Sequence, residues 1–152
     1  MTNPIDRIFD TRDLMSYVEF IQEQLSEMYN NEFEDKEDFA ELDQSDFEDF
    51  DWIENLQFYT EFKKEFSNDL ADFKELLEFY QLLSETPDFE YGETVISEDE
   101  FLDYCKEMLE DIGYIPKDLP SWIEIDFEAT SENMKADYFS VDFDNNTYFV
   151  RA

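Results

Sequence analysis

Negative charge constrains this chain more than any other feature of its sequence. The 152 residues include 43 Asp and Glu against 10 Lys and Arg, which gives a net charge of -33. Self-repulsion on this scale keeps a chain unfolded when apolar residues are few. Here 42% of the residues are hydrophobic and 18% are aromatic, and each aromatic side chain can bury roughly 150–250 Å². We therefore expect a folded protein with an aromatic core and an anionic surface.

The net charge of the chain can be compared with that of duplex DNA. DNA carries about one negative charge per 1.7 Å of helix axis, so 33 charges correspond to roughly 55 Å of duplex. Such a surface repels nucleic acids and anionic membranes, but it attracts proteins that hold phosphates with Lys and Arg. The charge therefore predicts a protein that imitates DNA and binds a basic DNA-binding partner. No direct contact with nucleic acid or membrane is expected.

The length, the composition and the single cysteine predict a protein with one core that resides in a reducing cytosol. A chain of 152 residues with 2 Gly and 4 Pro can form one core and contains no long flexible linker. Its N-terminus lacks the pattern of a secretion signal, and no stretch approaches the ~20 apolar residues of a membrane span. The single cysteine, Cys105, cannot form an internal disulfide, so we expect a structural thiol in a reducing bacterial cytosol.

Apolar periodicity predicts a mainly helical α+β fold. Helices are expected over 11–30, 54–66, 68–84 and 97–112, with a short helix over 129–136 and a short strand at 94–96. Asp10 or Thr11 is the expected N-cap of the first helix. Ser97 and Glu100 match a capping box, in which each side chain accepts from the backbone amide of the other residue. Gly113 is placed to end that helix.

The C-terminal residues predict a β-hairpin. Residues 138–143 alternate between apolar and polar side chains, Asp144-Asn-Asn-Thr supplies turn residues, and 147–151 return as a strand. The expected architecture is an elongated acidic domain, mainly helical, with a small hairpin at its C-terminus.

Two acidic clusters are the candidate partner-binding sites, with carboxylates in the place of phosphates. Residues 32–54 hold 12 acids and one base, interrupted by aromatic residues. In the helix over 97–112, acids at three- and four-residue steps share one face, away from Phe101 and Cys105. The candidate residues are Glu34, Asp35, Asp38, Asp46, Glu48, Asp49 and Asp51 in the first cluster, and Asp99, Asp103, Glu107, Glu110 and Asp111 in the second.

Residues 97–138 contain an ordered series of short motifs. An acidic helix ends in Glu110-Asp-Ile-Gly-Tyr, a proline turn follows at Ile115-Pro-Lys-Asp-Leu-Pro, then Trp122, and then Ile125-Asp-Phe-Glu-Ala. This order resembles the C-terminal part of the ArdA antirestriction proteins. In that family Glu-Ala is followed by an aromatic residue and Gly-Arg-Asp, whereas this chain continues with Thr130-Ser-Glu-Asn.

The resemblance implies a function and a domain organisation. ArdA proteins are acidic DNA mimics that occupy the DNA-binding groove of type I restriction–modification enzymes, often as dimers. The implied partner is such an enzyme in the host defence, and the implied assembly includes a homodimer. Residues 33–152 would form the acidic ArdA-like domain, preceded by an N-terminal amphipathic helix extension over 1–32.

Other function classes have weaker support in the sequence. With no His in the chain, His-based catalysis and His metal sites are excluded, so no enzyme is expected. No stretch has the ligand spacing of an EF-hand, and neither a metal site nor a cofactor is predicted. A halophilic surface, a DNA mimic against a CRISPR effector nuclease or a DNA repair enzyme, and an acidic adaptor or chaperone for basic proteins remain as alternatives.

Self-repulsion leads to a prediction about stability. Added salt should raise the melting temperature, because at ~0.15 M the Debye length falls to about 8 Å and the carboxylates are screened from one another. Thermal unfolding followed by circular dichroism over a salt series measures this. A melting temperature that falls steadily as salt is added would contradict a surface dominated by repulsion.

Overall fold

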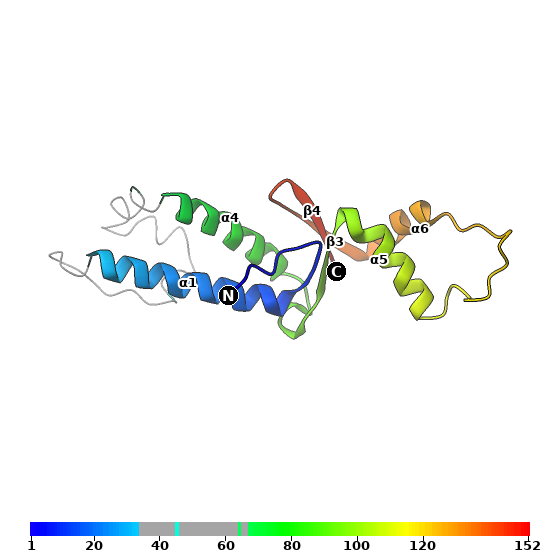
Figure 1. The fold of residues 1–152 in the computed structure, drawn as a ribbon, viewed down its shortest axis with the longest axis horizontal. Coiled ribbons are helices and arrows are strands. Elements are labelled where there is room, and N and C mark those ends of the chain that lie inside the picture. Colours follow the sequence, from blue (N-terminus) through cyan, green and yellow to red (C-terminus); the bar gives the residue numbers. More distant parts are fainter. Residues whose placement is uncertain (34–44, 46–63, 65–66) are drawn as a thin grey trace. The chain divides into compact units, whose positions relative to one another are not determined.

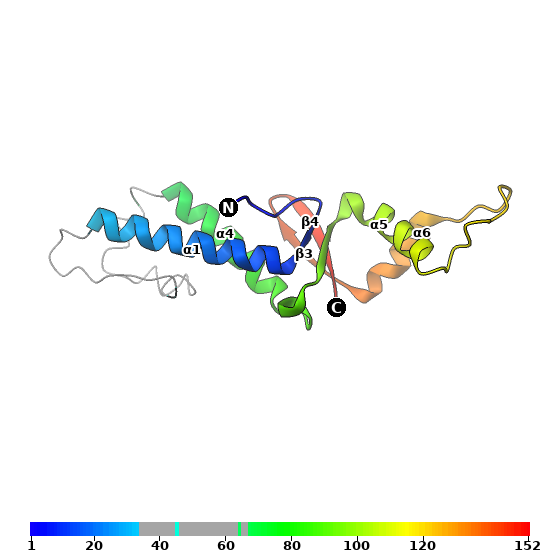
Figure 2. The ribbon, with the colours of Figure 1, turned by 60° about the horizontal axis from the view of Figure 1, so that its bottom comes forward.

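The computed structural model describes residues 1–33, 45, 64 and 67–152, and it has a mixed α+β fold (Figures 1 and 2). Four α-helices and one four-stranded antiparallel sheet occur among these residues. The α+β class and the C-terminal hairpin are confirmed, whereas the helix expected over 54–66 lies, apart from Lys64, outside the described residues. In chain order the elements are β1 (Ile8–Asp10), α1 (Thr11–Phe33), α4 (Ser67–Leu83), the 3-10 helix η2 (Phe89–Tyr91), β2 (Thr94–Ser97), α5 (Glu98–Asp111), α6 (Phe127–Met134), the 3-10 helix η3 (Lys135–Asp137), β3 (Tyr138–Phe143) and β4 (Asn146–Arg151).

The chain divides into two compact units. One comprises Met1–Asn3 and Asp13–Gln81, and the other comprises Pro4–Arg12 and Leu82–Ala152. Strand β1 therefore belongs with the C-terminal part of the chain. The domain boundary expected between residues 32 and 33 lies beside residues that the structure does not describe, and it stays a prediction.

The first unit contains all but the first two residues of α1 and all but the last two of α4, and the two helices run in opposite directions (Figures 1 and 2). Apolar residues at helical spacing are buried on both helices, as their periodicity predicts. Among the described residues, no helix is both long enough and apolar enough to cross a membrane. The buried apolar residues are Leu14, Val18, Leu25 and Tyr29 on α1, and Phe73, Leu76, Leu77 and Phe79 on α4.

The second unit is built on the sheet, whose strand order is β1-β2-β4-β3. Helix α5 begins directly after β2. Two of its residues, Phe101 and Cys105, are buried in a core that also contains Ile96 and Phe149. The Phe101 ring lies 4.8 Å from the Phe149 ring and 5.1 Å from the Tyr138 ring, the latter edge to face. This aromatic cluster attaches α5 to β3 and β4.

The hairpin has the turn that its sequence predicts. Asp144 and Asn145 have φ angles of 50° and 61°, as a two-residue turn between twisted strands requires, and these residue types tolerate the left-handed region. Beside the turn, the Asn146 side-chain amide donates to the Asp144 carbonyl at 3.1 Å. The strand register follows, from Phe143 opposite Asn146 to Tyr138 opposite Arg151.

Strand β1 was not predicted from the sequence. Its three residues are too few to show alternation, and its partner β2 lies in the second half of the chain. Ile8 pairs with Ile96 and Phe9 with Val95, and Phe9 also packs against Tyr148 with a ring separation of 5.8 Å. Tertiary pairing, not local propensity, therefore decides this strand.

Asp10 is the N-cap of α1, one of the two residues expected there. Its carboxylate accepts from the Arg12 backbone amide at 2.8 Å and from the Arg12 guanidinium at 3.0 Å. Hydrogen bonding to the Arg12 side chain lowers the pKa of Asp10 from its ordinary value. The cap and the ion pair therefore both favour the charged carboxylate.

The capping box expected at Ser97 and Glu100 is wrong in its bonding, although Ser97 is the N-cap of α5. The Ser97 side chain makes no capping hydrogen bond, and its backbone amide donates to the Arg7 carbonyl at 2.7 Å. The Glu100 carboxylate instead pairs with the Arg7 guanidinium at 3.0 Å. Arg7 immediately precedes β1, and this strand brings it to the start of α5. Arg7 therefore bonds to both the Ser97 amide and the Glu100 carboxylate, the two groups that the capping box would have joined.

Thr11 generates a prediction about the stability of the second unit. This buried side chain donates to the Phe89 carbonyl at 2.8 Å and accepts from the Glu93 amide at 2.9 Å. Thr11→Val keeps the shape but removes both bonds, so it should lower the free energy of unfolding by about 1–3 kcal/mol. Urea denaturation measures the change. Thr11→Ser, which keeps the hydroxyl, is the matched control, and its free energy of unfolding should fall much less. Equal losses of stability in the two variants would show that the hydroxyl is unimportant.

Candidate functional site

Helix α5 carries a row of exposed carboxylates on the side away from the core. Asp99, Asp103, Glu107 and Glu110 are all exposed, and we call these four residues the α5 row. Phe101 and Cys105 are buried on the opposite side. The expectation that this helix separates its acids from its apolar residues is therefore confirmed, while the role of the row in binding stays a prediction.

The α5 row is not neutralised by neighbouring cations. Helix α5 holds seven acidic residues and one basic residue, Lys106. Glu100 is the acid of α5 that pairs with an Arg, and the four residues of the row form no ion pair with any residue that the structure describes. Their carboxylates remain open to a partner.

Two nearby lysines lie against aromatic rings. The Lys106 ammonium lies 5.1 Å from the Phe127 ring centroid. The Lys135 ammonium pairs with Glu132 at 2.6 Å and lies 5.2 Å from the Phe149 ring centroid. Cation–π contacts of this kind hold a positive charge close to a ring face. These two ammonium groups are therefore held against aromatic side chains, and they form no ion pair with the α5 row.

Helix α6 adds carboxylates next to α5. It begins at Phe127, with the Asp126 carboxylate accepting from the Ala129 amide at 3.0 Å as an N-cap. An open groove of about 530 Å³ runs between the two helices, with Glu98 on its α5 side and Glu128 and Glu132 on its α6 side. Over the whole second unit, 21 acidic residues stand against six basic ones, a net charge of -15.

The remaining candidate residues fall into two groups. Asp111 is exposed at the last position of α5. The first acidic cluster, Glu34, Asp35, Asp38, Asp46, Glu48, Asp49 and Asp51, lies outside the described residues. The structure therefore places only the α5 half of the proposed binding surface.

The C-terminal end of α5 has a Schellman motif. Gly113 has a φ of 82°, a left-handed conformation that glycine adopts at low cost. The Tyr114 amide donates to the Leu109 carbonyl at 3.0 Å, and the Gly113 amide donates to the Glu110 carbonyl at 3.2 Å. Ile112, expected in the apolar stripe of this helix, is instead 56% exposed because the helix ends before this residue.

Cys105 lies in the core cluster and is buried. Burial raises the pKa of the Cys105 thiol, and the nearby Lys135 ammonium only partly opposes this. A buried neutral thiol is a poor nucleophile. Within the described ranges, no group of three or more His, Cys, Asp and Glu side chains is arranged to hold a metal ion.

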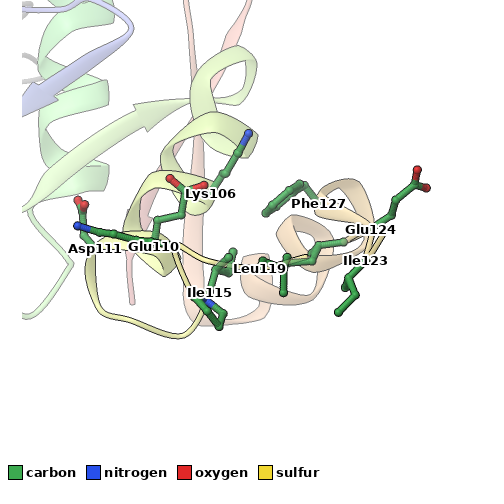
Figure 3. A pocket seen from close by; sticks show the side chains of 11 residues that line it. Lys106, Glu110, Asp111, Ile115, Leu119, Ile123, Glu124 and Phe127 are labelled. Carbon is green, nitrogen blue, oxygen red and sulfur yellow. The ribbon is translucent and has the colours of Figure 1, made fainter. Parts of the chain in front are cut away.

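The loop over 112–126 is a feature that the sequence interpretation missed as a site. Beneath it lies an open groove of about 760 Å³, lined by apolar loop residues and by Phe127 of α6. In Figure 3 the side chains of Ile115, Leu119 and Ile123 lie on one side of the groove, with Lys106 and Phe127 on the other. Tyr114 and Trp122, on either side of the two prolines, are the available signal, but in the sequence they serve only as members of the motif series over 97–138.

Comparison with protein-family models, with curated proteins and with solved structures finds no match to this chain. The resemblance of residues 97–138 to the ArdA proteins stays a prediction.

The ends of α5 generate a prediction about helix stability. Acidic residues near a helix N-terminus are stabilising and those near its C-terminus are destabilising, each by about 0.3–1 kcal/mol. α5 has Glu98 and Asp99 in its first turn and no basic residue in its last turn. The double variant Glu110→Gln/Asp111→Asn should therefore be more stable than Glu98→Gln/Asp99→Asn by about 1–4 kcal/mol.

The two double variants remove the same number of charges, so each is the control for the other. Thermal unfolding at low ionic strength compares them. If both variants melted at the same temperature, the position of charge along α5 would be irrelevant, and only the net charge of the protein would matter.

Proposed function

We propose that this protein is a non-enzymatic DNA mimic that inhibits a DNA-binding enzyme of host defence. The α5 row carries the proposal: it is a line of exposed carboxylates that form no ion pair with any described residue, on a helix that is fixed to an aromatic core. In this mechanism the carboxylates take the place of DNA phosphates and accept hydrogen bonds from Lys and Arg in the groove of the enzyme.

The charge density of α5 supports this mechanism. Seven acids and one lysine in 14 residues leave a net charge of -6. At about 1.5 Å of rise per residue the helix is about 21 Å long, so it carries about one net charge per 3.5 Å. One strand of B-DNA carries one phosphate per about 3.4 Å of axis. A basic groove would therefore meet a similar charge per unit length on either molecule.

The fixed position of the row supports tight binding. Phe101 and Cys105 attach the inner face of α5 to the sheet, so the helix backbone does not need to become ordered when the partner binds. Preorganisation reduces the entropy lost on association. Release of the counterions that surround the row would add to the affinity, as it does for DNA.

The proposed target is a type I restriction–modification enzyme, as the resemblance to ArdA proteins suggests. Inhibition of this kind would take place in the bacterial cytoplasm, where these enzymes act on DNA. A CRISPR effector nuclease or a DNA repair enzyme is the next target to test by the same assay. Each has a basic groove for the phosphate backbone, and charge complementarity alone does not separate them.

The proposal predicts competition with DNA. Adding the protein to a purified type I restriction–modification methyltransferase bound to fluorescein-labelled duplex DNA should release the DNA, because both ligands use one basic groove. Fluorescence anisotropy measures the release, and higher salt should weaken it. The quadruple variant Asp99→Asn, Asp103→Asn, Glu107→Gln and Glu110→Gln should compete about tenfold less well, a loss of about 1.4 kcal/mol.

A matched control removes four other exposed charges from the same unit, through Asp88→Asn, Asp137→Asn, Glu85→Gln and Glu90→Gln. This control should compete almost as well as the unmodified protein. Binding to the enzyme without release of DNA would refute mimicry. Equal losses in the two quadruple variants would show that only bulk charge matters, and the adaptor function would then be favoured.

A further inference from the structure

Large apolar side chains are exposed around the loop over 112–126. Tyr114 and Trp122 are 78% and 80% exposed, and Ile112 and Ile123 are 56% and 39% exposed. Tyr114 is adjacent in sequence to Ile115 and Trp122 to Ile123, and both isoleucines line the groove beneath the loop. Exposed apolar groups gathered around a hollow are typical of protein interaction sites. Tyr and Trp are also the residues that most often dominate binding energy at such sites.

Local hydrogen bonds hold the backbone of this loop. The Schellman motif at Gly113 fixes its start, and the Asp126 N-cap fixes its end. Between them, the Leu119 amide donates to the Pro116 carbonyl at 3.3 Å and the Ile123 amide donates to the Pro120 carbonyl at 3.0 Å. The exposed aromatic residues are therefore presented on an ordered segment, which reduces the entropy lost on binding.

The groove combines apolar walls with acidic edges. Leu119, Ile123 and Phe127 contribute apolar side chains, while Glu110, Asp111 and Glu124 contribute carboxylates (Figure 3). Lys106 and Lys117 also line the groove, so three carboxylates stand against two ammonium groups, and the Lys106 ammonium lies 5.1 Å from the Phe127 ring centroid. An occupant that complements this groove carries an apolar side chain flanked by positive charges.

We propose that this groove, together with Tyr114 and Trp122, binds a basic amphipathic segment of the partner protein. The inference rests on the proposed function, because the groove would give the DNA mimic an apolar contact that DNA itself does not offer. An apolar side chain of the partner enters between Ile123 and Phe127, and its Lys or Arg residues pair with Glu110 and Glu124. Charge would then bring the two proteins together, and the apolar contact would select the partner and resist salt.

Trp122 is a built-in reporter of this contact. The chain contains two tryptophans, Trp52 and Trp122, so the variant Trp52→Phe leaves Trp122 as the single one. The probes are two 14-residue peptides of equal positive charge, one of Lys and Leu in an amphipathic pattern and one of Lys and Ser. The Lys/Leu peptide should shift the Trp122 emission to shorter wavelength and reduce its quenching by acrylamide. The Lys/Ser peptide should bind through charge and leave Trp122 exposed.

Three single variants locate the contact, with fluorescein-labelled peptide and anisotropy as the measurement. Trp122→Ala and Ile123→Ser should each lower the affinity for the Lys/Leu peptide about tenfold and the affinity for the Lys/Ser peptide less than about twofold. Tyr91→Ala is the matched control, because Tyr91 is 77% exposed but does not line the groove; it should change neither peptide. Circular dichroism confirms that each variant is folded.

Three results would overturn the inference. These are an equal Trp122 response to both peptides, no Trp122 response to either, or a Trp122 emission that shifts with protein concentration alone, which would make a second copy of this chain the occupant. The outcome is independent of the DNA-competition assay. Competition without a Trp122 response refutes the groove and leaves DNA mimicry intact. A Trp122 response without competition refutes mimicry against that enzyme and leaves the groove as a site for another basic protein.

Discussion

The aromatic contacts beneath α5 are the interaction on which the proposed surface depends. A helix with a net charge of -6 is opposed by repulsion along its own length, and such a helix is marginal when isolated in water. Phe101, in contact with Tyr138 and Phe149, provides the burial that offsets this cost. The charge on the outer face is therefore tolerated because the inner face of the same helix is packed on the sheet.

The distribution of positive charge follows from the same constraint. With 10 Lys and Arg against 43 Asp and Glu, the cations cannot neutralise the surface, and three of the cations that the structure describes make particular contacts. Arg7 joins the start of α5 to the residues before β1 through Glu100, while Lys106 and Lys135 lie over aromatic rings. These cations connect elements of the second unit and leave the α5 row exposed.

The second unit also carries both surfaces for which we propose binding. The α5 row offers charge, which acts at long range and weakens with salt. The groove beneath the 112–126 loop offers apolar surface, which acts only on contact and depends little on salt. They share Glu110, which belongs to the α5 row and also lines the groove. A partner could therefore meet both surfaces at one place on the molecule.

Local patterns were enough to predict the elements that have a strong period or a specific turn. The period of Leu14, Val18 and Leu25 predicted α1, and the alternation before Asp144-Asn-Asn predicted the hairpin. Gly113 predicted the end of α5. The exposed side of α5 also followed from the sequence, because its acids and its apolar residues fall on opposite sides of an ideal helix. In these places the information lies within a few neighbouring residues.

What the sequence determined by itself is therefore the charge, the helical periods, the hairpin and the segregation of acids on α5. Only the tertiary structure decided the rest. Strand β1 exists because Phe9 pairs with Val95, a partner far along the chain. Ser97 and Glu100 do not form the expected capping box, because β1 brings Arg7 next to both of them. The groove likewise requires residues of α5, of the loop and of α6 to come together. Contacts between residues distant in sequence have no local signature, so no period or turn could have predicted them.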